Sequence, residues 1–524
     1  MHESPPAALR GARILRSVRP LFPQQHTACH LSTPCRRSLR GVRCPVVPSA
    51  SRGSSSPELP PRWTPAAGCR TARSPAEVKA GAEVTEPNHP PNGAAPAPPA
   101  VRRKAVLAAS IGNFVEWFEF TLYGFFAAAI AVNFFPVPDG TSSLIPTFAA
   151  FGISFVLRPL GALVFGHFGD RLGRRGTLAV SLIGMSAATF VIGVLPNADT
   201  IGVLAPILLI VARVAQGFSA GGEFGGATAY MVEYAPEHRR NFFGSWQFFT
   251  QMLAGLAGSA VGASLSAVLS EQALNAWGWR IPFLLTLPLG VIGFYLRLRL
   301  DETPQFKAEQ GGERGAPLPT VLREHWPNVL KVIGLMITGT TFFYMVQAFF
   351  PAFLVEQVGL ARGQMFAAMM IGTCAQLVLI PLWALYADRI GRRRPMLVGS
   401  LAVLVVCAVP TYLLFLHGTF GSAALGYLVL AVVLAPMTGC LATALAESFP
   451  TSVRYSGLSV AYSVSVSVFG GFTPLILSAL AASGRLAPAY YLVGAAVLSL
   501  VAALLLPESA QSSDPASDRD GAAV

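Results

Sequence analysis

The chain has 524 residues, of which 53% are hydrophobic and only 12% are charged, and its formal net charge at pH 7 is +12. Soluble domains carry about 25% charged residues, so this composition indicates a protein built for lipid. The first hundred residues hold 13 of the 38 Lys and Arg residues against five acidic ones, so the net charge gives no reason to expect a nucleic-acid partner.

Residues 1–100 form a basic tail that is rich in Pro, Ser, Ala and Arg and has no apolar periodicity. Such a segment cannot bury a core, and we expect it to be disordered. A transit peptide is one alternative, and a translation start assigned too far upstream is another, because the next Met is Met185. The seven cysteines show no disulfide or metal-ligand spacing, so we expect no metal and no cofactor.

Twelve apolar segments follow from Ala105 onward, and each is long enough to cross a bilayer as a helix. We therefore expect an all-α integral membrane fold of twelve transmembrane helices, followed by a short disordered tail at 508–524. The approximate spans are residues 105–132, 145–168, 176–195, 201–232, 242–269, 280–299, 330–353, 364–387, 395–416, 423–446, 456–481 and 488–506.

A repeated turn divides these spans into two sets of six. Gly169–Arg175 reads Gly-Asp-Arg-Leu-Gly-Arg-Arg, and Ala387–Arg393 reads Ala-Asp-Arg-Ile-Gly-Arg-Arg. We therefore expect two pseudo-symmetric six-helix halves, at 101–300 and 330–507, joined by a cytoplasmic linker at 301–329. Transporters built from such repeats hold their substrate between the halves, near the middle of the membrane, and expose it to each side in turn.

Charge in the short loops predicts the orientation. The loops with the repeated turns are rich in arginine, whereas alternate loops such as 132–144 and 196–200 contain no Lys or Arg. The positive-inside rule then places the basic loops and both termini in the cytoplasm. We expect a monomeric multi-pass protein of the cell's inner or plasma membrane.

The repeated turns also suggest a gate. Their glycine permits a tight connection between helices, and their aspartate could accept hydrogen bonds from the N-terminus of an opposed helix. Their arginines could pair with carboxylates such as Glu233 or Glu447. Anchoring by positive loops alone is the alternative. The predicted gating residues are Asp170, Arg171, Gly173, Arg174, Arg175, Asp388, Arg389, Gly391, Arg392 and Arg393.

The first span contains two carboxylates, which are costly in a bilayer and therefore suggest function. At about 100° per residue, Asn113, Glu116, Glu119 and Tyr123 share one stripe of the helix. A span that excludes water favours the protonated carboxyl, as a coupling site for protons requires. We predict Glu116 and Glu119 as proton-coupling residues, with Glu223 in reserve; a carboxylate pair that only bonds a neighbouring helix is the alternative.

Two arginines inside the spans could hold a substrate. Arg158 precedes Pro159, which should bend the second span, and Arg213 shares a helix face with Glu223. A guanidinium can grip a carboxylate bidentately, although Arg213 and Glu223 could instead pair with the first helix. Taken singly, each remaining polar candidate is better explained by an interhelical hydrogen bond than by contact with a substrate. The predicted substrate-binding residues are Asn113, Tyr123, Arg158, Arg213, Gln216, Gln247, Tyr344, Gln347 and Tyr462.

Four motifs can be compared with known families. They are Gly-Asn-x-x-Glu-Trp-Phe-Glu-Phe from Gly112, Leu-Arg-Pro-Leu-Gly from Leu157, Gln-Gly-Phe-Ser-Ala-Gly-Gly-Glu from Gln216 and Trp-Gly-Trp-Arg-Ile-Pro-Phe from Trp277. Together they resemble the metabolite:proton symporter family of the major facilitator superfamily, and the resemblance covers about residues 102–508.

The resemblance implies proton-coupled uptake of a small carboxylate or zwitterion, such as proline, betaine or an organic acid. Glu116, Glu119, Arg213 and Glu223 match the intramembrane charges of that family, which usually has Asp where this chain has Glu119. We therefore predict a secondary active transporter that works by alternating access, with the proton as coupling ion. A transporter-like receptor that binds solute without moving it is the alternative. We do not expect an enzyme, because no nucleophile–base pair, phosphate loop or metal cluster stands out.

Overall fold

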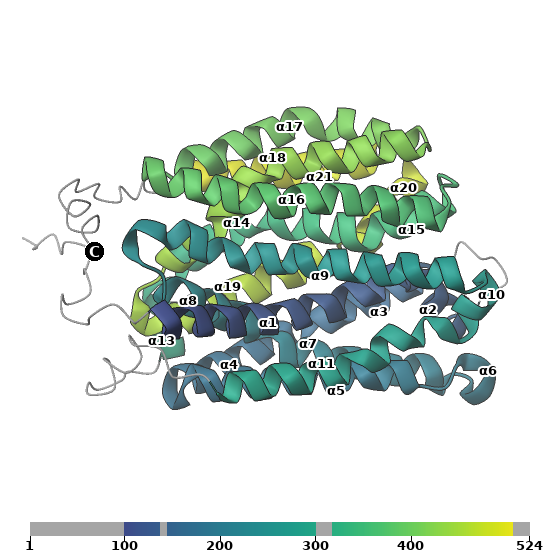
Figure 1. The fold of residues 1–524 in the computed structure, drawn as a ribbon, viewed down its shortest axis with the longest axis horizontal. Helices are drawn as coiled ribbons and strands as arrows, with labels where there is room; N and C mark the ends of the chain where they lie inside the picture. Colours follow the sequence, from purple (N-terminus) through teal and green to yellow (C-terminus); the bar gives the residue numbers. More distant parts are fainter. Residues whose placement is uncertain (1–98, 137–143, 300–316, 507–524) are drawn as a thin grey trace, which may run out of the picture. The chain divides into compact units, whose positions relative to one another are not determined.

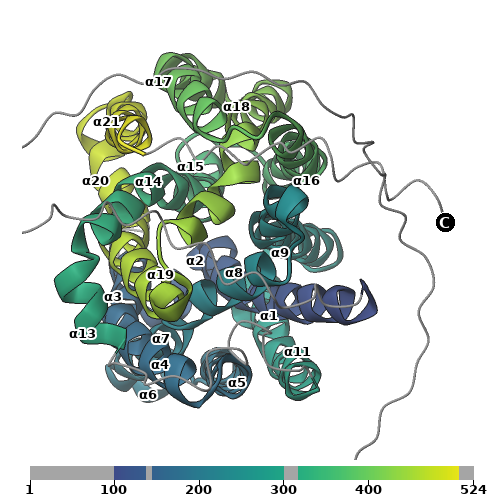
Figure 2. The same ribbon diagram turned by 90° about the vertical axis from the view of Figure 1, so that its left-hand side faces the viewer.

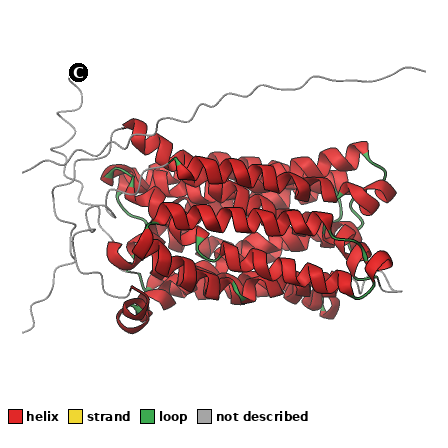
Figure 3. Ribbon diagram, turned by 90° about the horizontal axis from the view of Figure 1, so that it is seen from below, coloured by secondary structure: helices red, strands yellow, loops and turns green. Residues whose placement is uncertain are grey.

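The computed structural model describes residues 99–136, 144–299 and 317–506, and every regular element in these ranges is a helix (Figures 1 and 3). Eleven described helices are long and apolar enough to cross a membrane, and a bent pair at the start of the chain makes a twelfth span. The predicted fold class is thus confirmed. The predicted tails and the start of the linker lie outside the described residues.

Several of the first six spans consist of two consecutive helices separated by a short break in the helix. They comprise α1 (Pro99–Phe125), α2 (Ala127–Phe134), α3 (Leu144–Val156), α4 (Arg158–Leu172), α5 (Arg174–Val194), α6 (Ala198–Ile201), α7 (Leu204–Ala220), α8 (Glu223–Glu233), η1 (Glu237–Arg239), α9 (Arg240–Val268), α10 (Glu271–Ala273), η2 (Leu274–Gly278) and α11 (Arg280–Leu298).

The second six spans follow a short helix that lies within the predicted linker. The elements are α13 (Pro317–Glu324), α14 (Trp326–Tyr344), η4 (Met345–Phe349), α15 (Phe350–Glu356), α16 (Arg362–Ile390), α17 (Arg394–Leu416), α18 (Phe420–Glu447), η5 (Thr451–Val453), α19 (Arg454–Ser465), η6 (Val466–Gly471), α20 (Thr473–Ser483) and α21 (Ala487–Leu504).

The two halves lie side by side. In Figure 1 the first half, purple to teal, occupies the lower part, and most of the second half, green to yellow, lies above it. Figure 2 looks along the bundle and shows α9 and α16 next to each other where the halves meet. These two helices pack together extensively, and α19 crosses the boundary to pack on α4 and α8. Side chains in the middle of the bundle therefore face both halves.

The first span differs from the prediction of one continuous helix. It bends by 62° between α1 and α2. Just before the bend, a Cβ on Gly124 would lie 2.7 Å from the carbonyl oxygen of Gln347, so the backbone of η4 approaches α1 more closely than any larger residue permits. The sequence pattern of α1 cannot show this contact, because it comes from the other half.

The second span breaks where the sequence predicts a bend, at Pro159 in the first turn of α4. Glycines of α7 and its C-cap then let this region approach closely. A Cβ on Gly217 would lie 1.5 Å from the carbonyl oxygen of Ser154, and one on Gly221 would lie 2.4 Å from that of Arg158. The main chains of these two spans are thus in direct contact, which fixes where their arginines can reach.

The repeated turns use their glycines as predicted. Gly173 has φ 115° between α4 and α5, and Gly391 has φ 68° at the end of α16, a backbone region that favours glycine. The same turn thus closes the same helix pair in both halves.

Candidate functional site

Among the described residues of the first half, six charged residues are at most 2% exposed. They are Glu116, Glu119, Arg158, Arg213, Glu223 and Arg297. Because an unpaired charge in an apolar interior costs several kcal/mol, roughly, the partners of each one indicate what it can do.

Glu116 forms an ion pair with Arg158. The Nη2 group of Arg158 donates to Oε1 of Glu116 at 2.5 Å, and both side chains are fully buried. The guanidinium also lies over the rings of Phe120 and Tyr462, each 5.2 Å from its carbon centre. Tyr462 comes from α19, so this pair lies where the two halves meet. The carboxylate that Arg158 holds in this structure is therefore one of the protein's own.

Glu119 is surrounded by neutral donors instead. The hydroxyl of Ser186 donates to its Oε1 at 2.5 Å, and the hydroxyl of Thr189 donates to its Oε2 at 2.7 Å. Both hydroxyls belong to α5, one turn apart. Glu116 and Glu119 are three residues apart on α1, yet one is paired with a cation and the other with hydroxyls.

Arg213 pairs with no carboxylate in the described part of the chain. It donates to Oε1 of Gln216 and, at 3.0 Å, to the hydroxyl of Ser154, while its Nε has no hydrogen-bond partner. Its guanidinium lies over the ring of Tyr123 at 4.3 Å and over that of Phe151 at 4.9 Å. A fully buried cation held only by neutral groups is suited to accept an anionic group from a bound solute.

Glu223 pairs with Arg297 on α11. Both nitrogens of the guanidinium fork donate to the carboxylate, which also accepts from Ser181 at 3.2 Å. Arg297 additionally donates to the carbonyl oxygen of Leu178. Glu223 therefore lies in a neutral pair that contacts α5 and α11.

Asn113, Gln247 and Trp117 form a separate amide cluster between α1 and α9. Gln247 donates to Oδ1 of Asn113 at 2.6 Å, and the amide of Asn113 donates to the hydroxyl of Thr250 at 2.7 Å. Trp117 donates to the same Oδ1. The structure thus gives Asn113 and Gln247 the interhelical hydrogen bonds that were the alternative to substrate contact.

Aromatic side chains of both halves surround the two arginines. The ring of Tyr344 on α14 lies 5.6 Å from that of Phe151 and 5.3 Å from that of Phe155, and its hydroxyl has no hydrogen-bond partner. Tyr462 stacks on Phe224 at 3.5 Å. The hydroxyl of Tyr123, in contrast, donates to the carbonyl oxygen of Thr147.

Gln347 lies in a different place. It lines a small pocket of about 320 Å³ of empty space between α9 and the second half, together with Thr373, Gln376 and Tyr427. Its Oε1 and the Nε2 of Gln376 both lack a partner. The structure thus brings Tyr344 and Tyr462 together with the arginines and leaves Gln347 outside that group.

The repeated turn of the second half ties the two halves together at the end that carries the basic loops. The carboxylate of Asp388 accepts from the backbone N–H groups of Asn241 and Phe242, in the first turn of α9, at 2.9 Å each. Arg393 pairs with Glu447, which also lies 3.6 Å from Arg240.

The first half contributes to the same ties. Its Glu233 lies 3.3 Å from Arg454 on α19, so an ion pair crosses the boundary there too. Arg175 donates to the carbonyl oxygen of Leu298. The side chains of Asp170, Arg171 and Arg174 lie outside the described residues. Arg389 and Arg392 are exposed.

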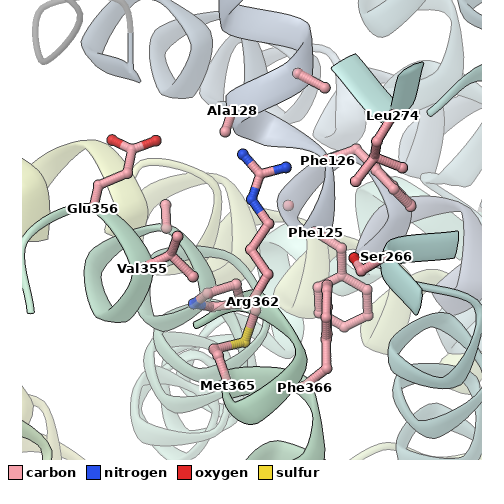
Figure 4. Close-up of a pocket in the computed structure, with 14 residues that line it drawn as sticks. Phe125, Phe126, Ala128, Ser266, Leu274, Val355, Glu356, Arg362, Met365 and Phe366 are labelled. Carbon is pink, nitrogen blue, oxygen red and sulfur yellow. The ribbon is translucent and has the colours of Figure 1, made fainter. Parts of the chain in front are cut away.

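The opposite end holds a pocket of about 460 Å³ of empty space between α2, α15 and α16 (Figure 4). Figure 4 shows the Arg362 side chain reaching across it toward Ala128, with Glu356 at one side. Arg362 lies 3.6 Å from Glu271 of the first half, whose side chain is 79% exposed. The contact across the halves is thus weaker here than at the basic end.

Sequence reasoning missed several of these partners. Nothing in the sequence singles out Arg297 within the span 280–299, and Ser186 and Thr189 carry no motif. A guanidinium in the last turn of an apolar span ordinarily reaches the membrane surface, so its inward turn becomes visible only from the packing of α11. Ser186 and Thr189 could have been identified as partners of Glu119 by another signal: two hydroxyls one turn apart in an apolar span.

Comparisons with known proteins extend this picture. The family described as Sugar (and other) transporter matches residues 105–318 and 321–513. The proline/betaine transporter of Escherichia coli (strain K12) is 40% identical over 424 residues, covering 78% of this chain and 84% of that protein. The citrate-proton symporter of Klebsiella pneumoniae is 35% identical over 404 residues, covering 77% of this chain and 91% of that protein.

A solved structure shares the fold. The proton:xylose symporter XylE of the major facilitator superfamily, bound to 6-bromo-6-deoxy-D-glucose, matches with a TM-score of 0.64. The match covers 79% of this chain and 97% of that one at 15% sequence identity. At that identity it speaks for the arrangement of helices alone.

Proposed function

We propose a function from one premise: the chain belongs to the sugar (and other) transporter family and is a secondary transporter of the major facilitator superfamily, not an enzyme. The proposal is that it couples the uptake of a small carboxylate or zwitterionic solute to the inward movement of protons. The observation that carries it is the buried cation of Arg213, which is held only by neutral groups and lies one glutamine and one threonine away from the buried carboxylate Glu119.

The substrate's carboxylate is assigned to Arg213. Its Nε is without a partner, and replacing its contact with Ser154 would free a second N–H for a carboxylate. Proline, betaine and citrate, which name the similar transporters, all carry a carboxylate. The neighbouring rings of Tyr344 and Phe151 suit the remaining apolar or cationic part of a zwitterion.

The coupling proton is assigned to Glu119 rather than to Glu116. Protonation of Glu116 would leave Arg158 as an uncompensated buried cation, a cost of about 3–5 kcal/mol. Glu119 has no such partner, since hydroxyls can accept from the acid as well as donate to the carboxylate. Glu223 is held by Arg297 in the same way as Glu116 is held by Arg158, which makes it a weaker candidate.

Alternating access requires ties that break at one end while the other end closes. The contacts of Asp388 and Glu447 at the basic end, and that of Arg362 at the opposite end, are suited to this because each joins the two halves. We place the basic end and both termini in the cytoplasm and the protein in the plasma membrane. The charged cluster is complete within one chain, so a monomer suffices.

Uptake into proteoliposomes tests the function. Labelled proline, glycine betaine and citrate are each offered with an inward proton gradient and, separately, as counterflow without a gradient. Glu119→Gln should abolish gradient-driven accumulation and keep counterflow, which needs binding and alternation but no net proton movement. Glu116→Gln should impair both, because it leaves Arg158 unpaired. Binding without accumulation by the wild type would indicate a receptor, and full accumulation by Glu119→Gln would place the proton elsewhere.

Side-specific labelling tests the orientation. In a cysteine-free background, Arg392→Cys in the repeated turn should react with an impermeant reagent only from the cytoplasm. His417→Cys, in an exposed loop at the opposite end, should react only from outside and serves as the matched control. Reversed reactivity would invert the assignment.

A further inference from the structure

We propose that Thr189 and Gln216 are positioning residues that transmit the protonation state of Glu119 to Arg213, so that proton binding strengthens substrate binding. This proposal rests on the proposed function and adds the route by which the two ligands communicate. It concerns two neutral side chains on α5 and α7, neither of which titrates in the range of interest.

The route is a continuous chain of hydrogen bonds. Arg213 donates to Oε1 of Gln216, whose amide nitrogen donates to the hydroxyl of Thr189 at 2.6 Å. That hydroxyl donates in turn to Oε2 of Glu119 at 2.7 Å. The direction is unambiguous, because a guanidinium can only donate and a carboxylate can only accept. All four side chains are fully buried, so water does not replace any link.

The hydroxyl of Thr189 has a second acceptor within reach, so the hydrogen bonds between Arg213 and Glu119 can rearrange when Glu119 is protonated. Its hydroxyl also lies 3.0 Å from the carbonyl oxygen of Met185, one turn earlier in α5. When Glu119 takes up a proton, its new O–H needs an acceptor. The hydroxyl of Thr189 can turn its hydrogen to Met185 and accept from Glu119, while it still accepts from Gln216. Every group then keeps a hydrogen bond in both states.

The surrounding charges favour this route over others. On α1 the nearest charge is Glu116, which is engaged by Arg158 of α4, and on α11 Arg297 is engaged by Glu223 of α8. On α5 the contacts of Glu119 are hydroxyls. Arg213 of α7 is left as the buried cation that reaches Glu119 through Gln216 and Thr189. An ionised Glu119 polarises these hydrogen bonds and strengthens the hold of Gln216 on Arg213. When Glu119 is neutral this hold weakens, and a substrate carboxylate then binds Arg213 more tightly.

Coupling of this kind is reciprocal and measurable as an affinity ratio. We expect the wild type to bind its substrate about 10-fold more tightly at pH 5.5 than at pH 7.5, within the usual range for coupled sites. Binding of labelled proline, glycine betaine and citrate to purified protein gives this ratio. Thr189→Val, which keeps the shape and removes the hydroxyl, should reduce it to less than about 2-fold while counterflow at saturating substrate continues.

Three further variants separate a relay from a merely structural role. Thr189→Ser should restore the ratio, and Gln216→Met, which can neither donate nor accept strongly, should abolish it even if Thr189→Val does not fold. Thr438→Val is the matched control, because it removes a buried hydroxyl that bonds only its own helix, α18. It should keep the full ratio.

The outcomes distinguish this proposal from the proposed function. If Glu119→Gln loses gradient-driven uptake but Thr189→Val or Gln216→Met keeps the wild-type affinity ratio, the relay is wrong and the proton site stands. If the wild type accumulates none of the three solutes, or if Glu119→Gln still accumulates substrate, the proposed function fails and the relay fails with it.

Discussion

The two halves share a topology and a repeated turn, but they differ in where they keep charge. In the first half, the described spans bury Glu116, Glu119 and Arg158 in the middle of the bundle. In the described part of the second half, the buried charge is Arg393, at the basic end. The second half carries interior prolines in three helices, α16, α17 and α18, and π-helical segments at η4 and η6. The described part of the first half has an interior proline in α11 and one π-helical segment, η2.

This difference indicates how two halves of the same topology can take different roles, one in binding and the other in conformational change. Buried charges need partners held at fixed positions, and the close glycine contacts between α7 and the second span hold these main chains together. Helices interrupted by proline or by a π-segment have freed backbone groups and bend more easily. The first half is therefore suited to hold the proton and the solute, and the second to move its wall and its aromatic side chains against them.

The strongest way to break this comparison is to disturb a charge pair of the first half. Glu223→Gln leaves Arg297 buried without a charge partner, which should cost about 3–5 kcal/mol and deplete folded protein. The double variant Glu223→Gln, Arg297→Met should recover most of the loss. Thermal unfolding followed by fluorescence-detected size-exclusion chromatography measures both. Equal stability of the single variant and the wild type would contradict the pairing.

A conservative exchange at the arginines sharpens the comparison within the first half. Arg213→Lys loses the planar fork that can hold a carboxylate, so substrate affinity should fall about 10- to 100-fold. Arg158→Lys can keep the ion pair with Glu116, so it should lose less substrate affinity. The loss should come mainly from the missing contacts of the guanidinium with Phe120 and Tyr462. The Kd of each variant for the transported solute is the measurement. A larger loss at Arg158 would exchange the two roles.

The gate offers a smaller effect, in rate rather than in affinity. Asp388→Asn keeps one oxygen for the first turn of α9 but loses the charge that favours this helix N-terminus, worth about 0.3–1 kcal/mol. Transport should slow by a few-fold while the Kd stays within error. Initial rates and equilibrium binding, measured on the same preparation, check this. A large loss of binding at normal turnover would show that Asp388 acts on the site and not on the gate.

The smallest effect is expected in the second half itself. Gln376 lines the small pocket next to Gln347, and its amide nitrogen makes no recorded hydrogen bond, so Gln376→Leu removes little. We expect uptake within about 2-fold of the wild type, since most substitutions away from a satisfied network are mild. Uptake at subsaturating substrate is the sensitive assay. A loss as large as that of Arg213→Lys would show that the second half also holds substrate-binding chemistry.

Much of the fold was predictable because each span is identified by the hydropathy of consecutive residues. Hydropathy placed twelve spans. The structure adds breaks within them and short helices between them, such as α13, and the bend between α1 and α2 is the main correction. The repeated turn predicted a tight connection between helices, and the structure shows it with positive φ at Gly173 and Gly391, a backbone that glycine adopts freely. These features depend on residues that are neighbours in the chain.

The pairing of the buried charges was less predictable. Periodicity shows that Glu116 and Glu119 share a face of α1, but not that Arg158 meets the former and Thr189 the latter. That choice depends on how α4 and α5 are rotated about their axes. The close contact of Gly221 with the carbonyl oxygen of Arg158 helps to set the position of α4. Arg297 was overlooked for the same reason, since its partner belongs to another span.

The pairing of these charges has an electrical consequence. Glu116 cancels Arg158 and Glu223 cancels Arg297, so the net charge of the cluster is that of Arg213 and Glu119 alone. It is zero with Glu119 ionised and becomes +1 when Glu119 is protonated. With a zwitterion bound, the loaded carrier keeps that charge, and an inside-negative voltage drives it inward with up to about 2.3 kcal/mol per 100 mV. With a monocarboxylate bound, the loaded carrier is neutral and insensitive to voltage. Current recorded during uptake would therefore identify the charge class of the solute.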